Sequence, residues 1–219
     1  MATAAGDIIE DARDQHPGFD DHRHSDRILL RQLSAYHRTL CVKATNANES
    51  ILASAAIIPL PLTSFVAGYT LPAHQYVHGA DVAWANGVDR TPLSIVPWAA
   101  RNDAGRFPGA YIHGGVLYLR GEESEWTQFA SIHLSYTPAP ADFTALTDVI
   151  SLPDTARDPC TAALALFMAK RTPPDSTLPP ISLDLFVRQA ADAEDAFLAD
   201  VFLRRGNQDN RIRDVRSFA

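Results

Sequence analysis

The stretch AYIHGGVLYLRG, residues Ala110 to Gly121, sets two glycines between two apolar runs. His113-Gly114-Gly115 after a strand can be the oxyanion-hole loop of an esterase. The same triplet can be the tight turn of a β-hairpin, because glycine adopts positive φ at both central turn positions without steric cost. The first alternative predicts an enzyme, and the second predicts a β scaffold.

The rest of the chain lacks the motif that an esterase needs. In α/β-hydrolases the nucleophile stands in a Gly-x-Ser-x-Gly motif later in the sequence. After Gly115 the remaining glycines are Gly121 and Gly206, and no serine near them has flanking glycines. The chain also lacks the alternating strand–helix order of that fold. We therefore predict a hairpin turned at Gly114-Gly115 in place of an esterase loop.

The hairpin belongs to a longer region, residues 49–140, that is typical of a β module. Prolines and glycines separate short apolar runs there, at the spacing of an all-β unit. Apolar and polar residues alternate most clearly in SIHLSY, residues 131–136, as in a strand with one buried face.

Amphipathic helices are predicted on both sides of this module. Ser25 is a good N-cap for a helix that runs to about Ala44. After the module, residues 162–170 are strongly apolar, and Ser182 can cap a last helix that Gly206 ends. In the helix after Ser25, apolar residues recur three to four positions apart at Ile28, Leu29, Leu33, Tyr36 and Leu40. In the last helix they recur in the same way at Leu183, Phe186, Ala190, Ala193, Phe197 and Val201.

These segments predict an α+β fold: a helical bundle built from N- and C-terminal helices with an inserted antiparallel β module. Residues 1–48 supply the N-terminal helices of the bundle, and residues 141–206 supply its C-terminal helices. Residues 49–140 form the inserted β module. Residues 207–219 form a C-terminal arm.

The composition is that of a globular protein with an acidic surface. The chain has 219 residues, 46% of them hydrophobic, and a net charge of −7, which gives it no general affinity for nucleic acid. The apolar stretch 51–68 carries Pro59 and Pro61 in its middle, so we expect strand and loop there and no membrane contact. The acidic N-terminus lacks the apolar core of a signal peptide, which predicts synthesis and folding in a cytoplasm.

We predict neither a cofactor nor a metal. The glycine motifs of phosphate-binding loops are absent from the sequence. His22 and His24 follow two aspartates and resemble a metal cluster, but a solvated loop between helices explains them equally. His74 and His78 lie four residues apart in an expected strand, which separates them by about 13 Å.

Tryptophans and cysteines are expected to be structural. Trp84, Trp98 and Trp126 all fall in the β module, where they can line a sugar-binding groove or, more often, anchor a core or an interface. Cys41 and Cys160 have no cysteine or histidine at metal-ligand spacing, so we expect reduced, partly buried thiols.

In the tail RIRDVRSF, residues 211–218, arginines alternate with apolar residues. An extended tail of this kind has one basic and one apolar face and can add to a partner subunit. The alternative is a frayed terminus. The sequence predicts a partner-binding arm made by Arg211, Ile212, Arg213, Val215, Arg216 and Phe218.

Three stretches of the chain resemble the head–tail connector proteins of tailed bacteriophages, also called adaptors or head-completion proteins. Residues 8–40, from IIEDARDQ to AYHRTL, look like their opening pair of helices. Residues 57–82 resemble their entry into a β module, with a Tyr-x-Leu-Pro motif before a strand. Residues 132–171 resemble their exit, where a Tyr-x-Pro strand end precedes Leu-Pro-Asp and a buried helix.

The resemblance implies a structural virion protein at the head–tail junction, made in the host cytoplasm. Such proteins have no catalytic residues and form a ring, typically of twelve copies, under the portal protein. The ring extends the DNA channel, offers a surface to tail proteins, and lets DNA pass without sequence recognition. The chain shows no strongly basic stripe for DNA, and an acidic lumen would let DNA slide.

Two other functions stay open at this point. The chain can be a different tail component, such as a terminator or baseplate protein, which ring symmetry and position in the particle would separate from a connector. It can also be a carbohydrate-binding or hydrolytic module that uses the tryptophan-rich β region. That function requires an exposed aromatic groove with a carboxylate pair nearby.

Overall fold

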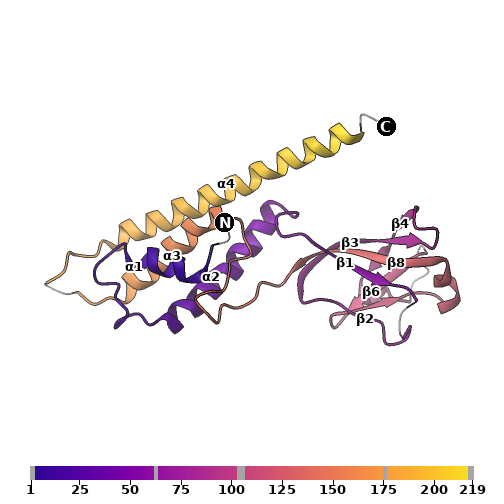
Figure 1. Cartoon of the computed structure of the whole chain (residues 1–219), viewed down its shortest axis with the longest axis horizontal. Coiled ribbons are helices and arrows are strands. Elements are labelled where there is room, and N and C mark those ends of the chain that lie inside the picture. The colour runs from indigo at the N-terminus through magenta and orange to yellow at the C-terminus, as the bar shows by residue number, and fades with distance from the viewer. Residues whose placement is uncertain (1–2, 62–63, 103–106, 175–176, 217–219) are drawn as a thin grey trace. The chain divides into compact units, whose positions relative to one another are not determined.

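The structure, a computed structural model, describes residues 3–61, 64–102, 107–174 and 177–216. Side chains are described up to Arg205. The chain divides into two compact units, which Figure 1 shows as a helical part and a part made of strands. The helical unit joins Met1–Leu52 with Pro140–Ala219, and the β unit is Ala53–Ala139. The fold is therefore mixed α+β, with a β unit where the sequence predicts a module at 49–140.

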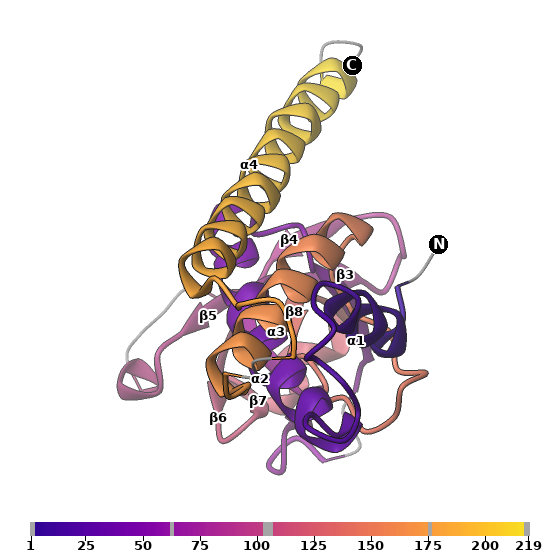
Figure 2. The same ribbon diagram turned by 90° about the vertical axis from the view of Figure 1, so that its left-hand side faces the viewer.

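The helices of the first unit share one hydrophobic core. They are α1 (Ala5–Arg13), α2 (Asp26–Ala47), α3 (Arg157–Arg171) and α4 (Leu183–Arg216). Figure 2 shows α1, α2 and α3 lying together beside the first part of α4. Six of the apolar positions that recur in the sequence line this core, namely Leu29, Leu33, Leu40, Phe186, Phe197 and Val201. Ile28 and Leu183, predicted on the same stripes, are exposed. Helices from both ends of the chain thus bury their apolar stripes against one another.

A short backbone pairing ties the start of the chain to the segment before α3. Ala4 and Val149 form an antiparallel bridge, and the amide of Ala5 donates to the carbonyl of Asp148 at 2.7 Å. The amide of Ile150 donates to the carbonyl of Thr3 at 3.1 Å. These bonds hold α1 next to the polypeptide that leads into α3.

The β unit is built from two sheets that enclose a second hydrophobic core. In order across the first sheet the strands are β1 (Ser54–Pro59), β8 (Phe129–Pro138), β3 (His74–Trp84) and β4 (Arg90–Pro92). In the second they are β2 (Tyr69–Thr70), β7 (Val116–Leu119), β6 (Gly109–His113) and β5 (Ser94–Val96). Ile132 and Leu134 of β8 and Leu117 of β7 are buried between the sheets, as their alternation with polar residues requires.

One strand pair departs from the predicted antiparallel module. Strand β5 pairs parallel to β6, with Ser94 opposite Gly109 and Val96 opposite Tyr111. A parallel pair needs a connection that returns the chain to the starting end. The connection follows Val96, and Trp98–Ala100 in it form a short 3-10 helix.

Strands β6 and β7 form an antiparallel hairpin, and Gly114-Gly115 is its two-residue turn. The φ angles are 58° at Gly114 and 77° at Gly115, the combination that a type I′ turn requires. The ring of His113 stacks on that of Trp98, with centroids 4.1 Å apart. His113 therefore packs beside the turn instead of standing in a catalytic loop.

Helix α4 is longer than the sequence predicts. The expected end at Gly206 and the separate arm at 207–219 are wrong for residues 207–216, because the backbone stays helical to Arg216. A single glycine inside a helix costs only about 1 kcal/mol relative to alanine, and no proline follows it to stop the helix. Among the described residues, no helix is both long and apolar enough to cross a membrane.

Candidate functional site

Three exposed arginines of α2, Arg27, Arg31 and Arg38, form what we call the arginine ridge. Arg31 and Arg38 follow Arg27 by about one and three turns of a helix with 3.6 residues per turn, so all three lie on one face. Leu29 and Leu33 are buried on the opposite face. Within the described part of the chain, neither Arg27 nor Arg31 has an ion-pair partner. The ridge therefore carries uncompensated positive charge.

Two hollows in the surface flank the ridge and share Arg27 and Arg31. The first has a volume of about 520 Å³ and contains Leu30 and Phe143. The second has a volume of about 490 Å³ and contains Ile28. Leu30 and Phe143 give the first hollow apolar wall surface, whereas Arg171 and polar side chains surround Ile28 in the second. A cationic ridge beside these hollows suits a protein partner that presents carboxylates next to apolar side chains.

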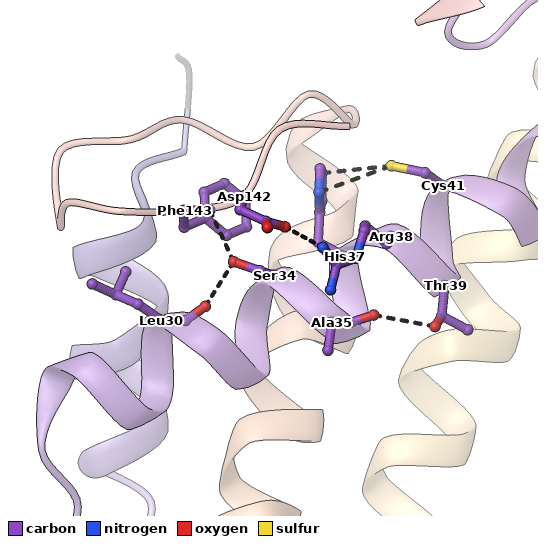
Figure 3. A network of polar contacts seen from close by, with 9 residues as sticks. All are labelled: Leu30, Ser34, Ala35, His37, Arg38, Thr39, Cys41, Asp142 and Phe143. Carbon is purple, nitrogen blue, oxygen red and sulfur yellow. Dashed lines mark hydrogen bonds and ion pairs between the residues drawn. The ribbon is translucent and has the colours of Figure 1, made fainter. Parts of the chain in front are cut away.

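The wall of the first hollow is a loop that α2 holds in place (Figure 3). The amide of Phe143 donates to Ser34 Oγ at 2.8 Å, and Ser34 Oγ donates to the carbonyl of Leu30 at 2.9 Å. One helical turn along, the Arg38 guanidinium pairs with the Asp142 carboxylate. Ser34 binds Phe143 and Arg38 binds the preceding residue, Asp142, so two side chains of α2 hold this part of the loop.

Replacing Ser34 with alanine is expected to destabilise the helical unit by about 1–3 kcal/mol. The change leaves the Phe143 amide without its acceptor at a buried position. The measurement is urea denaturation followed by far-ultraviolet circular dichroism. Thr39→Ala is the matched control, because Thr39 Oγ1 also donates to a carbonyl four residues earlier but is exposed. We expect less than about 0.5 kcal/mol for the control, and equal losses for both variants would contradict the role of Ser34.

A second polar cluster lies on the buried side of α2 and resembles a catalytic constellation. Figure 3 shows His37 and Cys41 pointing toward each other, with Cys41 Sγ 3.6 Å from His37 Nε2. Ser151 Oγ lies 3.2 Å from the same nitrogen, and the amide of Ser151 donates to it at 3.3 Å. Because this nitrogen accepts a backbone proton, we assign the ring proton to Nδ1.

Burial makes this cluster unsuited to nucleophilic chemistry. Cys41 is fully buried and His37 is 1% exposed. Burial raises the pKa of the Cys41 thiol to about 11 and lowers the pKa of His37 to about 4. A catalytic cysteine needs the opposite, a lowered thiol pKa and access to substrate. The same holds for Cys160, a free and buried thiol whose pKa burial raises to about 12. We assign these residues to the packing of the helical unit.

The histidines considered as metal ligands do not come together. His24 is buried, and its Nε2 lies 2.9 Å from Thr172 Oγ1. His78 Nε2 lies 2.7 Å from Thr137 Oγ1, while His74 Nδ1 lies 2.8 Å from the carbonyl of Pro72. Among the residues that the structure describes, no group of three or more His, Cys, Asp and Glu side chains can hold a metal ion.

The three tryptophans do not form an open aromatic groove. Trp126 is 2% exposed, and its Nε1 donates to the carbonyl of Arg120 at 2.8 Å. Trp84 is half-buried and donates to Thr91 Oγ1. Trp98 is exposed, but His113 stacks on its ring and the Arg101 guanidinium lies 3.9 Å from its centroid. A sugar ring would have to displace these groups, which weighs against a carbohydrate site.

The predicted arm residues cannot be placed as a binding surface. The backbone of residues 211–216 belongs to α4, and Phe218 lies outside the described residues. The arginine ridge was not among the predicted site residues. Its signal was in the sequence, since Arg27, Arg31 and Arg38 stand at the spacing of one helical face.

No protein-family model matches this chain, and no curated protein matches it either. Its function is therefore argued from its own residues and their geometry.

Proposed function

We propose that this chain is a non-enzymatic structural protein of a tailed-phage particle, a head–tail connector. Copies of it form a ring, typically of twelve, between the portal protein and the tail, and the ring extends the DNA channel. Each subunit contributes a helical bundle that packs against its neighbours, and the inserted β module faces the tail side or the outside. DNA passes through without sequence recognition.

The observation that carries the proposal is the exposure of α4. Phe186, Phe197 and Val201 are buried in the helical unit, but the other sides of the helix face solvent. Phe202 is 62% exposed and Leu203 is 68% exposed. Large apolar side chains side by side on an exposed helix are typical of a surface that a partner covers. A subunit of a ring has such partners on two sides.

The chemistry of the helical unit also favours a structural role. Of the residues closest to a catalytic arrangement, His37 and Cys41 are packed inside the helical unit with the thiol held protonated, and Ser151 contacts them from an exposed position. The exposed groups that stand out are instead charged and apolar side chains on helices α2 and α4. Surfaces of that kind support protein contacts.

The experiment that tests the proposal compares the full-length chain alone and mixed with the portal protein of the same particle. Light scattering gives the mass of the complexes, and negative-stain electron microscopy shows their symmetry. We expect rings on the portal, whether or not the chain is a monomer by itself. A chain that leaves the portal unbound under both conditions would contradict the proposal, and rings on tail ends instead would identify a terminator.

Deleting residues 207–219 is expected to give a folded protein that no longer joins portal rings. Among the α4 side chains described up to Arg205, the last buried one is Val201, so the helical unit keeps its core. The deleted residues comprise the last turns of α4, with three arginines, and Phe218 beyond them, and we propose that these side chains bind a neighbouring subunit or the portal. Far-ultraviolet circular dichroism checks the fold, and portal binding checks assembly. Normal rings from the truncated chain would remove the arm from the proposal.

A further inference from the structure

Helix α4 carries a row of acidic residues on the side turned away from the core. Asp184, Asp192 and Asp195 are exposed, and their spacing of eight and three residues keeps them on one half of the helix. Phe186 and Phe197 are buried on the other half. We call the exposed side, with its three carboxylates and the apolar residues Leu185, Phe202 and Leu203, the outer face of α4.

The charges of this face have no partners within the described part of the molecule. Asp184, Asp192 and Asp195 make no ion pair there, whereas Asp200 pairs with Arg204. Arg188 is the cation on the same face, so three carboxylates stand against one guanidinium. The outer face therefore has a negative excess beside exposed apolar surface.

The arginine ridge and the outer face cannot neutralise each other within one copy. Helix α4 contacts α2 through Glu194, which accepts a hydrogen bond from Tyr36 at 3.0 Å and pairs with Lys43. Tyr36 follows Arg27 by about two and a half turns, so the ridge lies on the far side of α2 from α4. The two charged surfaces point away from each other, and a second copy can bring them together.

The spacing of charges on the two helices is complementary. Along α2, Arg31 and Arg38 lie about 6 Å and 16 Å beyond Arg27, at 1.5 Å per residue. Along α4 in the reverse direction, Asp192 and Asp184 lie about 4.5 Å and 16 Å from Asp195. Two antiparallel helices can therefore set the three arginines against the three aspartates. Arg38 is already paired with Asp142, so the match depends on Arg27 and Arg31.

We propose that neighbouring copies of this chain join by docking the arginine ridge of one copy against the outer face of α4 in the next. The contact is heterologous, because each copy offers two different surfaces, and such a contact forms a ring where its repeated rotation closes. This inference rests on the proposed function, since it names the contact that builds the connector ring.

A second copy fits the ridge better than DNA does. Phosphates need cations alone, whereas the first hollow beside Arg27 and Arg31 is lined by Leu30, Phe143 and the carboxylate of Asp142. The second hollow contains Ile28 and adds Arg171 to the ridge arginines. The net charge of −7 also disfavours binding of the chain to a polyanion.

The test uses two full-length variants that reverse opposite sides of the contact. Arg27→Glu with Arg31→Glu places acids opposite the aspartates of α4. Asp192→Lys with Asp195→Lys places lysines opposite the ridge. Each variant alone is expected to associate with itself about 100-fold more weakly than the original chain. All four residues are exposed, so circular dichroism should show unchanged folding.

The equimolar mixture of the two variants gives the decisive result. Glutamates of one variant then meet lysines of the other, and the unchanged arginines meet the unchanged aspartates, so alternating copies restore both contacts. We expect association to return, and to weaken as salt is raised. Lys170→Glu with Arg90→Glu is the control for the arginine variant, because it changes the net charge by the same amount at exposed positions elsewhere and should leave association intact.

Other outcomes separate the proposed contact between copies from the connector function. Rings on the portal from the arginine variant alone would overturn the contact while the connector function stands. If the arginine variant formed normal rings but bound duplex DNA more weakly in a gel-shift assay, the ridge would be a DNA-binding surface. The proposed contact between copies would then be wrong. If mixing the two variants restored association but no form of the chain bound the portal, the result would support the contact and contradict the connector function. If the original chain neither self-associates nor binds the portal, both fail.

Discussion

Replacing Gly114 and Gly115 together with valine is expected to destabilise the β unit by about 2–4 kcal/mol. Both residues have positive φ, where a side chain costs an L-residue roughly 1–2 kcal/mol, and a β-branched side chain is the least tolerated. The cost comes from the backbone alone, because a Cβ at either position would have no neighbour within 4 Å. Tryptophan fluorescence during urea unfolding measures it, since Trp84, Trp98 and Trp126 all lie in the β unit.

The control for this prediction is Gly114→Asn. Asparagine followed by glycine is a preferred type I′ pair, so the single variant should unfold within about 0.5 kcal/mol of the original chain. Circular dichroism of the helical unit should stay the same in both variants. If the double valine variant kept the original unfolding midpoint, the turn would contribute nothing to the β unit.

The elements that the sequence predicts well are those with local causes. The Gly-Gly turn is required by backbone sterics at two adjacent positions, and the apolar stripe of α2 follows from the period of a single helix. The alternation in residues 131–136 appears in β8, where Ile132 and Leu134 are buried and their polar neighbours are partly exposed. In each case the signal lies within a few residues of the element that it predicts.

The features that the sequence does not predict depend on contacts between distant positions. Strand β8 pairs with β1 and β3, so the last strand of the β unit lies between two early ones. The contact of Ser34 with Phe143 joins residues 109 positions apart, and that of His37 with Ser151 spans 114 positions. Serine and histidine inside an amphipathic helix give no sign of such partners. The loop beside the arginine ridge could therefore not be foreseen.

Two misjudgements have local explanations. Gly206 resembles a helix stop, but a glycine weakens a helix by a modest amount and ends it only when the following residues favour another conformation. The arginine ridge of α2 was not predicted as a site. Spacing alone places Arg27, Arg31 and Arg38 on one face, so the ridge could have been predicted from the sequence.

The helical unit is expected to lose about 3 kcal/mol of stability through His37 as the pH falls from 7 to 4. Burial lowers the pKa of His37 from the ordinary 6.5 to about 4 in the folded protein. Between these two values the unfolded chain binds a proton that the folded chain does not, so acid favours unfolding. The full contribution of the neutral ring is present above pH 6.5. It is lost down to about pH 4, and below that both states are protonated.

Substitution of His37 by glutamine isolates this effect from the other groups that titrate in acid. The amide oxygen of glutamine can accept the hydrogen bond of the Ser151 amide, but glutamine has no charge to gain. Urea unfolding followed by far-ultraviolet circular dichroism at several pH values gives the free energy of each protein. We expect the variant to be less stable than the original chain at pH 7, because its contact with the Phe143 ring is lost. The difference between the two should shrink by about 3 kcal/mol on going to pH 4. A constant difference across that range would show that His37 is protonated equally in both states, and its burial would then not account for the acid sensitivity.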